Sequence, residues 1–412
     1  MTQRIVVIGT GYVGLPAAIM WAKSGYDVVG VDIDENLVRA INDRTLLIDE
    51  REMWELLAHP EVHRHLEART EPCEGDVFVI AVPTPVDPTR KVADLGFVEN
   101  AVASILPVLR PGNLVIVEST VPPLTCRELI RPQIEQGTGL KVPTEVMFAH
   151  CPERILPGDI FQEIVHNERL IGGLDQASTE AASKAYAAFV EGTMHPTDDL
   201  TAELSKLMEN TYRDVNIALA NELAQICESL GAAADEVFHL ANRHPRVNIL
   251  QPGIGVGGHC IPVDPWFLKE VAPDSSRLIT TARTINDEMP TRTAARIRRM
   301  VADLHSPVVV ALGATYKANC EDQRGSPAKE VVRLLREDGY QVRHCDPLVP
   351  ELAYDSLEAV LLQADLVAVL VGHRLIVKEL KALTSQLRQL MRNDRLLVCD
   401  WEARALLEEI DE

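Results

Sequence analysis

The chain has 412 residues, 46% of them apolar and 25% charged, which is typical of a globular protein with two or three domains. Its formal net charge of −21 argues against a general nucleic-acid or anionic-membrane binder, so local basic residues would have to hold any anionic ligand. The eight cysteines are scattered without a CxxC pair, which favours reduced thiols over disulfides or a metal site. We expect a cytoplasmic protein, because no secretory signal precedes the first strand pattern and every apolar run is too short to span a bilayer.

Short apolar runs alternate with helix-period segments through the first third of the chain. The runs cover residues 5–8, 28–31, 77–82 and 114–117, and a further strand is expected at 145–149. This alternation is typical of βαβ units and predicts a parallel sheet covered by helices.

The pattern changes near residue 198. A stretch without proline or glycine from 201 to 230 predicts one long helix, and more helix follows to about residue 242. A glycine-rich segment, 255–265, comes next and leads into helical sequence from about 265 to 304.

Alternating apolar runs return in the last hundred residues. Strands are expected at 308–312, 341–345, 366–371 and 396–399, with helices between them. The fold prediction is therefore an α/β chain with two doubly wound domains joined by a helical middle domain. We place the three domains at residues 1–197, 198–304 and 305–412.

A GxGxxG motif directly follows the first expected strand and opens a helix. Its glycines are Gly9, Gly11 and Gly14. Such glycines permit a tight turn and bring a pyrophosphate close to the helix N-terminus, where backbone N–H groups favour an anion. The alternative is a glycine turn at a strand–helix junction that binds no ligand. Because strand, glycines, helix and a second strand follow in order, we expect a Rossmann-like domain that binds a dinucleotide.

Three further positions bear on the cofactor. Asp32 ends the second expected strand, where an acid accepts hydrogen bonds from ribose hydroxyls, and the acidic residues that follow it favour NAD over NADP. Thr84 and Thr120 lie in turns after the third and fourth strands, at the edge where open α/β sheets bind ligands. Both suit cofactor contacts, and the alternative is that they are ordinary turn and capping residues.

The expected long helix carries Lys206, Asn210 and Arg213 at spacings that place all three on one face. A row of cation, amide and cation suits an anionic or hydroxyl-rich ligand. The alternative is an ordinary solvated helix face.

The glycine-rich segment presents a thiol, Cys260, with Asp264 close behind it. Glycines let the backbone approach a ligand, and a nearby cation such as Lys206 would favour the thiolate. A bound hydride acceptor and a presented thiol together indicate an oxidation through a covalent sulfur adduct.

Two polar clusters have no chemistry of their own at this level. Glu153 and Arg154 follow the strand expected at 145–149, and Lys317 and Arg324 flank a helix start in the last domain. The alternative for the second pair is surface charge around a helix N-cap.

These motifs together resemble the nucleotide-sugar 6-dehydrogenase family. The resemblance covers nearly the whole chain and rests on GTGYVGLP, AVPTP, EST, CPERILPG, AELSKLMENTYRDVNIALANE, ANRHPRVNILQPGIGVGGHCIPVDPWF and YKANCEDQRGSPA. CPERILPG and NRHPRVN are typical of the branch that acts on N-acetylhexosamine substrates.

The resemblance implies a role for each site residue. Cys260 would be the nucleophile, Lys206 the proton donor and acceptor helped by Asn210 and Asp264, and Glu153 the base of the hydrolytic step. The implied NAD contacts are Gly9, Gly11, Tyr12, Val13, Gly14, Asp32, Thr84, Thr120 and Arg324. The implied UDP-sugar contacts are Arg154, Ile155, Lys206, Asn210, Arg213, His244, Arg246, Gly257, Tyr316 and Lys317.

The implied reaction is a four-electron oxidation of a C6 alcohol to a uronate with NAD. The expected substrate is UDP-N-acetyl-D-mannosamine, with UDP-glucose or another UDP-N-acetylhexosamine as the alternative, since no single residue identifies the epimer. In this family Arg246 reaches the neighbouring subunit's site, which implies at least a homodimer. Other readings are a single-oxidation dehydrogenase of the 6-phosphogluconate type and a non-catalytic dinucleotide sensor.

Overall fold

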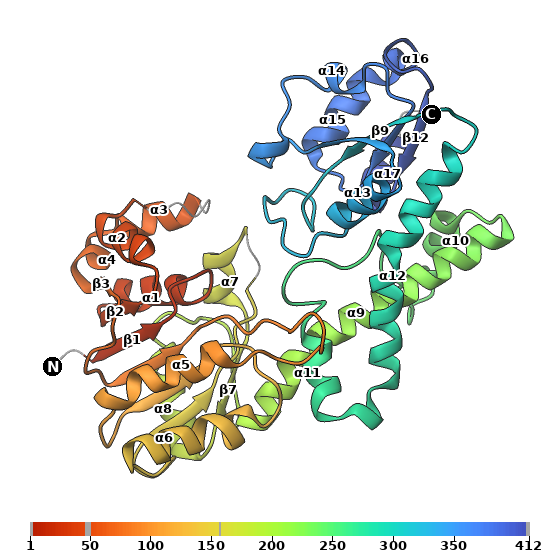
Figure 1. The fold of residues 1–412 in the computed structure, drawn as a ribbon. Helices are drawn as coiled ribbons and strands as arrows, with labels where there is room; N and C mark the ends of the chain where they lie inside the picture. The colour runs from red at the N-terminus through yellow and green to blue at the C-terminus, as the bar shows by residue number, and fades with distance from the viewer. Residues whose placement is uncertain (1–2, 46–50, 156–157, 409–412) are drawn as a thin grey trace. The chain divides into compact units, whose positions relative to one another are not determined.

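The computed structural model describes residues 3–45, 51–155 and 158–408 (Figure 1). Contacts within the chain divide it into two compact units. The first comprises Met1–Glu209 with Trp266–Ala272, and the second comprises Asn210–Pro265 with Pro273–Glu412. The division falls inside the long helix α9 (Asp199–Leu230), so one continuous helix contributes its first third to one unit and the remainder to the other.

The first unit is built on an eight-stranded sheet with the order β3-β2-β1-β4-β5-β6-β7-β8. Its strands are β1 (Arg4–Ile8), β2 (Asp27–Val31), β3 (Leu66–Arg69), β4 (Val77–Ile80), β5 (Leu114–Val117), β6 (Met147–His150), β7 (Arg169–Gly173) and β8 (Met194–Asp198). The five strands predicted in this part of the chain are confirmed, while β3, β7 and β8 are additional. All neighbouring pairs are parallel except β6 and β7, so the five predicted strands form the expected parallel sheet and the additional β7 joins it antiparallel.

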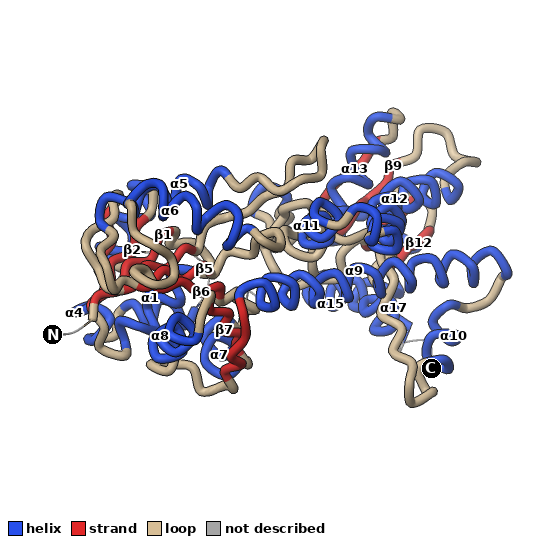
Figure 2. The backbone as a smooth tube through the Cα atoms, turned by 90° about the horizontal axis from the view of Figure 1, so that it is seen from below, coloured by secondary structure: helices blue, strands red, loops and turns tan. Residues whose placement is uncertain are grey.

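Helices cover both faces of this sheet (Figure 2). One face packs against α1 (Gly14–Lys23), α2 (Glu35–Asp43), α3 (Arg51–Leu57), α4 (Pro60–His65), α7 (Ile160–His166) and α8 (Gln176–Tyr186). The other packs against α5 (Gly96–Ile105), a π-helical turn (Cys126–Ile130) and α6 (Arg131–Thr138). Apolar side chains buried on both faces explain why β1, β4 and β5 read as continuous hydrophobic runs.

The second unit contains a four-stranded parallel sheet with the order β10-β9-β11-β12. Its strands are β9 (Val308–Leu312), β10 (Gln341–Cys345), β11 (Leu366–Val369) and β12 (Arg395–Val398), which confirms the four predicted strands. One face packs against α12 (Arg277–Met300) and α13 (Pro327–Glu337), and the other against α14 (Leu357–Leu361), α15 (Arg374–Leu383), α16 (Leu387–Leu390) and α17 (Trp401–Glu408). The predicted pair of doubly wound sheets is therefore confirmed.

The helical part of the second unit is held by a buried polar network. Arg283 and Asn286 on α12 both contact the carboxylate of Asp214 on α9, and the Asn221 amide donates to Asn286 at 3.0 Å. The predicted helix at 201–230 is confirmed and begins two residues earlier. The helical stretch predicted from 265 to 304 is interrupted at Pro273–Ser275, which separates α11 (Asp264–Val271) from α12.

Within the described ranges, no helix is both long and apolar enough to cross a membrane. None of the eight cysteines forms a disulfide in this part of the chain. The same ranges contain no cluster of three or more His, Cys, Asp or Glu side chains arranged to hold a metal ion.

Candidate active site

The glycine turn between β1 and α1 has one position that is open and two that are closed. A Cβ on Gly14 would lie 1.9 Å from the carbonyl oxygen of Gly9, and a Cβ on Gly9, whose φ is +90°, would lie 2.5 Å from the carbonyl oxygen of Ala81. A Cβ on Gly11 would meet no atom within 4 Å. The N-cap residue Val13 makes no side-chain hydrogen bond, and the first turn of α1 has no acid. The turn therefore combines tight backbone packing with open space at a positive helix end, which fits a pyrophosphate group.

Asp32 lies at the end of β2 and forms hydrogen bonds with the glycine turn. Its Oδ2 accepts hydrogen bonds from the Thr10 N–H at 2.9 Å and the Thr10 hydroxyl at 3.1 Å, while Oδ1 accepts from the N–H of Asp34 at 3.1 Å. Thr10 is fully buried, whereas Tyr12 is about half exposed at the tip of the turn. Asp32 is thus fixed in orientation by Thr10, a contact that the sequence pattern did not single out.

The turns after β4 and β5 meet at the same edge of the sheet. The Thr84 hydroxyl donates to the carbonyl oxygen of Thr120 at 2.7 Å, and the Ser119 hydroxyl accepts from the N–H of Val82 at 2.9 Å. Since β1, β4 and β5 are neighbours, these turns and the glycine turn share one carboxyl edge, where doubly wound sheets bind ligands. The structure brings Thr84 and Thr120 together there.

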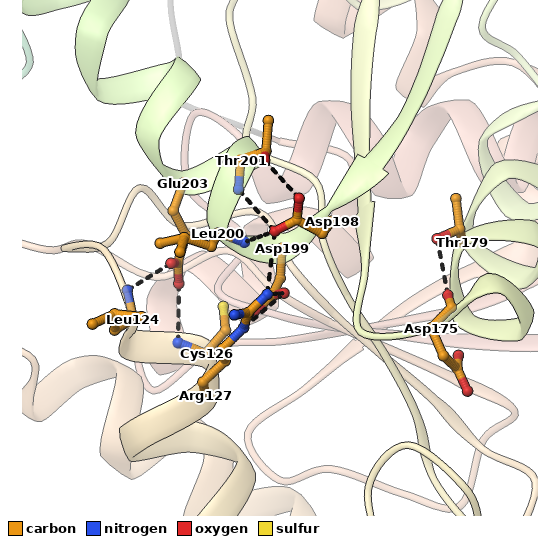
Figure 3. Close-up of polar contacts among 10 residues, drawn as sticks. All are labelled: Leu124, Cys126, Arg127, Asp175, Thr179, Asp198, Asp199, Leu200, Thr201 and Glu203. Atoms are coloured by element: carbon orange, nitrogen blue, oxygen red, sulfur yellow. Dashed lines mark hydrogen bonds and ion pairs between the residues drawn. The ribbon is translucent and has the colours of Figure 1, made fainter.

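The first turns of α9 are anchored to the segment before α6 (Figure 3). Arg127 forms an ion pair with Asp199, whose side chain is fully buried. One turn later, Glu203 accepts hydrogen bonds from the backbone N–H groups of Leu124 at 2.7 Å and Cys126 at 3.0 Å. These contacts fix both the position and the rotation of the helix that carries Lys206.

Lys206 is buried and lies near an imidazole that stays neutral. Burial lowers the pKa of His150, at the end of β6, to about 3, and the positive charge of Lys206 acts in the same direction. Lys206 therefore belongs to the carboxyl edge of the first sheet, one helical turn before Asn210 on the same face of α9.

Glu153 lies at this edge too, in a cluster of buried charged side chains. Arg169, at the start of β7, forms ion pairs with both Glu153 and Glu118. The Tyr186 hydroxyl donates to Oε1 of Glu118 at 2.6 Å, and the Arg169 guanidinium lies 4.2 Å from the centre of the Tyr186 ring. The N–H of Arg154 donates to Glu153 at 2.7 Å.

Arg169 and Tyr186 are functional candidates that sequence reasoning missed. The available indication was an arginine at the start of a short apolar run, RLIGG, which is unusual for a strand buried on both faces. In the structure Arg169 bears the only positive charge among the four side chains of the cluster. Burial raises the pKa of Glu118 to about 7, against the opposing effect of Arg169.

Arg154 and Ile155 complete the site residues of the first unit. The Arg154 guanidinium bonds to Glu209 of α9 at 2.9 Å and also donates to the carbonyl oxygen of Glu168. Ile155 packs against the apolar layer on the α1 side of the sheet. Arg154, a predicted substrate contact, therefore already joins two other parts of this unit.

In the second unit, a hydrogen bond links α9 to the turn that presents the thiol. The Asn210 amide donates to Oδ2 of Asp264 at 2.5 Å, and Arg213 donates to the Asn210 side-chain oxygen. The N–H of Asp264 donates to the carbonyl oxygen of Cys260 at 2.9 Å, so Cys260 sits on the turn that opens α11. Cys260 is exposed within the chain, whereas Asn210 and Asp264 are buried.

The glycines before Cys260 allow its loop to pack on the segment after β9. A Cβ on Gly257 would lie 2.8 Å from atoms of Tyr316 and Gly325, so no larger residue fits there. The N–H of Gly258 donates to the carbonyl oxygen of Arg324 at 3.0 Å. Loop and segment thus form one surface that carries Cys260, Tyr316 and Arg324.

The remaining predicted site residues of this unit are exposed. Lys317 follows Tyr316 in the segment after β9, and its carbonyl oxygen accepts from the hydroxyl of Thr315 at 2.8 Å. His244 and Arg246 lie in the turn after α10 (Ala234–Ala241), where the N–H of Arg246 donates to Nδ1 of His244 at 3.4 Å. The Arg324 guanidinium pairs with Asp322 at 2.6 Å.

Comparison with known proteins places these features in one family. Three family models match in chain order: the NAD-binding domain (residues 3–190), the central domain (200–288) and the UDP-binding domain (310–402) of the UDP-glucose/GDP-mannose dehydrogenase family. The chain is 43% identical over 378 residues to a UDP-N-acetyl-D-mannosamine dehydrogenase from Methanococcus maripaludis, covering 90% of this chain and 86% of that one. It is also 43% identical over 387 residues to an NDP-N-acetyl-D-galactosaminuronic acid dehydrogenase from Ralstonia solanacearum, covering 90% and 91%.

A solved structure extends the similarity to the fold. The UDP-D-ManNAc dehydrogenase of Pyrococcus horikoshii superimposes with a TM-score of 0.91 at 39% identity, over 97% of this chain and 95% of that one. The glycine turn and Asp32 lie inside the region matched by the NAD-binding domain, and their geometry fits that cofactor. This chain is an NAD-dependent enzyme that belongs to the UDP-glucose/GDP-mannose dehydrogenase family.

Proposed function

We propose that the enzyme oxidises the C6 alcohol of a UDP-N-acetylhexosamine, UDP-N-acetyl-D-mannosamine, to the uronate in two steps through a covalent intermediate on Cys260. The observation that carries the proposal is the contact between Asn210 and Asp264, because Asp264 also holds the Cys260 carbonyl. That contact ties the thiol-bearing turn to the helix that carries Lys206 one turn earlier. Relatives named for N-acetylhexosamine substrates support this choice of sugar.

The chain's own residues supply proton transfer, nucleophile and base. NAD, when bound, accepts a hydride in each oxidation. Lys206 takes the proton of the C6 hydroxyl, with Asn210 and Asp264 fixing its surroundings. The Cys260 sulfur then attacks the aldehyde carbon to form a thiohemiacetal, which the second oxidation converts to a thioester.

Hydrolysis of the thioester completes the reaction. Glu153 takes a proton from water, the water oxygen attacks the thioester carbon, and the carbon–sulfur bond breaks to release the uronate and the Cys260 thiolate. The covalent intermediate prevents loss of the aldehyde between the two oxidations, which is the purpose of a nucleophile in this chemistry.

The glycine turn, Tyr12, Val13, Asp32, Thr84, Thr120 and Arg324 hold the cofactor in this proposal. The UDP-sugar lies against Arg154, Ile155, Arg213, Gly257, Tyr316 and Lys317. The segment after β9 follows a point where the strand order reverses, since β9 lies between β10 and β11, and such points form ligand crevices. In this proposal the chain has three domains, at residues 1–197, 198–304 and 305–412.

We propose further that the enzyme is a cytoplasmic homodimer or larger homo-oligomer. One face of α9 carries exposed apolar side chains with a seven-residue spacing at Tyr212, Leu219 and Ile226, and Leu230 continues it. A monomer rarely leaves such a stripe in water, and a second copy of the helix would cover it. His244 and Arg246 are exposed and available to a neighbouring subunit's site.

The test is to follow NADH formation with limiting UDP-sugar. UDP-N-acetyl-D-mannosamine, its gluco and galacto epimers, and UDP-glucose are each incubated with excess NAD. Two NADH per molecule of the mannosamine substrate, at the highest kcat/KM of the four, is the expected result. One NADH per sugar would indicate a single oxidation of the 6-phosphogluconate type, and no NADH with any of the four would contradict the proposed substrate class.

A further inference from the structure

The one antiparallel strand pair of the first sheet brings a charged residue to its carboxyl edge. In the β6–β7 pairing, Ala149 is opposite Gly173 and His150 is opposite Gly172. Extending this register by three residues along each strand places Glu153 opposite Arg169, at the start of β7. A parallel β7 would place Arg169 at the other edge of the sheet. The ion pair between Glu153 and Arg169 is therefore a direct consequence of the strand direction.

Arg169 is held from behind by a second carboxylate and a tyrosine. Its side chain is 4% exposed, and those of Glu153 and Glu118 are 7% and 0% exposed. Tyr186 donates its hydroxyl to Glu118 and places its ring against the guanidinium. A planar guanidinium binds two carboxylates in fixed directions, which the point charge of a lysine does not reproduce.

Burying this cluster of charged side chains costs free energy, which argues against a purely structural role. Glu118 and Glu153 share one guanidinium, and Oε2 of Glu118 has no hydrogen-bond partner among the described residues. Leaving a buried polar atom without a partner destabilises the fold, and apolar side chains would fill the same space without that penalty. Burial also raises the pKa of Glu118. The cluster therefore has features of a site arranged for chemistry.

We propose that Arg169 is a positioning residue for the hydrolytic half of the reaction, fixing the Glu153 carboxylate for proton abstraction while Glu118 and Tyr186 fix Arg169. The inference rests on the proposed role of Glu153 as base. In this step Glu153 accepts a proton from water, the oxygen adds to the thioester carbon, and Cys260 leaves as the thiolate. Arg169 touches none of the reacting atoms and acts only through Glu153.

The test compares the two halves of the reaction in Arg169→Lys, using rapid quenching and intact mass spectrometry. The probe is the UDP-sugar that the wild type turns over fastest, mixed with excess NAD. We expect an early burst of two NADH per active site at close to the wild-type rate. Steady-state turnover should then fall by about 10- to 100-fold, the loss seen when a residue that orients a metal ligand is removed, while the thioester adduct accumulates. A purely structural role would lower both phases together.

Two reference variants separate the possible failures. Glu153→Gln should accumulate the adduct more strongly than Arg169→Lys, and a lack of adduct in Glu153→Gln would overturn the proposed function itself. If Glu153→Gln accumulates the adduct while Arg169→Lys keeps the wild-type ratio of burst to steady state, only the present inference is overturned. Arg283→Lys is the matched control, because Arg283 is a buried arginine that also bridges two carboxylates, Asp214 and Asp287. It should leave the ratio unchanged.

A milder variant keeps the inference testable if Arg169→Lys does not fold. Tyr186→Phe retains the ring against the guanidinium and removes only the hydroxyl that donates to Glu118. It should shift the burst-to-steady-state ratio in the same direction as Arg169→Lys, by a smaller factor. A wild-type ratio in Tyr186→Phe together with an unfolded Arg169→Lys would count against the positioning role.

Discussion

The carboxyl edges of the two sheets use buried charge in different ways. In the first sheet, Glu118 and Glu153 share Arg169, and an oxygen of Glu118 lacks a hydrogen-bond partner among the described residues. At the second sheet, the buried side chains of Asp346 and His373 both have hydrogen-bond partners. The first edge therefore has a buried carboxylate oxygen without a hydrogen-bond partner in the described part of the chain. At the second edge, the buried polar side chains form hydrogen bonds that hold a loop.

Asp346 and His373 connect three backbone segments at the second edge. Asp346 accepts hydrogen bonds from the N–H of Ala314 at 2.6 Å, the N–H of Leu348 at 2.8 Å and Nε2 of His373 at 2.9 Å. Nδ1 of His373 accepts from the N–H of Asn319 at 2.9 Å, which assigns the proton to Nε2. The segment between Ala314 and Asn319 carries Tyr316 and Lys317, so the pair fixes both ends of a proposed substrate loop. One edge is thus suited to chemistry and the other to binding.

The largest expected effect comes from removing the proposed nucleophile. Cys260→Ser should lower NADH formation by about 10³-fold, because an alcohol is a far weaker nucleophile than a thiolate. The measurement is steady-state NADH formation, with Cys73→Ser in the other unit as the control at wild-type activity. Two NADH per sugar at the wild-type rate in Cys260→Ser would remove the covalent step from the account.

The glycine turn offers a sharper comparison within the first edge. Gly11→Ala should weaken NAD binding on the order of tenfold or more while leaving the melting temperature of the ligand-free protein unchanged, since its Cβ meets no atom of the chain. Gly14→Ala should instead destabilise the protein by about 2–4 kcal/mol, because its Cβ would lie 1.9 Å from the Gly9 oxygen. Thermal melting with and without NAD measures both. Equal melting behaviour of the two variants would contradict this account of the turn.

Removing the imidazole at the second edge should weaken binding of the UDP-sugar more than it slows the reaction. His373→Ala leaves the N–H of Asn319 without its acceptor, so we expect a loss of about 1–3 kcal/mol in unfolding free energy. The KM for the UDP-sugar should rise about tenfold with kcat within about twofold of wild type. His305→Ala, an exposed histidine of the same unit, is the control. A fall in kcat at unchanged KM would reverse the assignment of this edge.

Neutralising Glu118 should change how the stability of the protein depends on pH. Burial raises the pKa of Glu118 from 4.5 to about 7, so between these values the folded protein binds more protons than the unfolded chain. The stability that this proton binding adds to the folded state is fully present below pH 4.5 and is lost as the pH rises through 7. Glu118→Gln should therefore gain stability relative to wild type between pH 5 and pH 8, on the order of 2 kcal/mol. Urea unfolding at both pH values measures it, and a constant difference would show that Glu118 titrates normally.

Prediction from sequence succeeded where apolar pattern determines structure. The strands at 114–117 and 308–312 coincide with observed strands, because buried parallel strands read as continuous hydrophobic runs. The glycine turn and Asp32 were predictable because a dinucleotide turn restricts residue type at fixed spacing.

Prediction failed where tertiary contacts decide. β3 (Leu66–Arg69) alternates buried and exposed positions over only four residues, and β8 (Met194–Asp198) contains a proline and polar side chains, so neither has a clear strand pattern. The direction of β7 is not encoded in its composition. As a result the pairing of Arg169 with Glu153 and Glu118 emerges only from the folded sheet.

Peptide mapping of the covalent intermediate tests the central claim most directly. Glu153→Gln is mixed with NAD and UDP-N-acetyl-D-mannosamine, quenched in acid and digested. The account predicts that the mass of the acyl UDP-sugar is found on the peptide containing Cys260 and on no other cysteine peptide. NADH formation without any covalent mass on that peptide would contradict it.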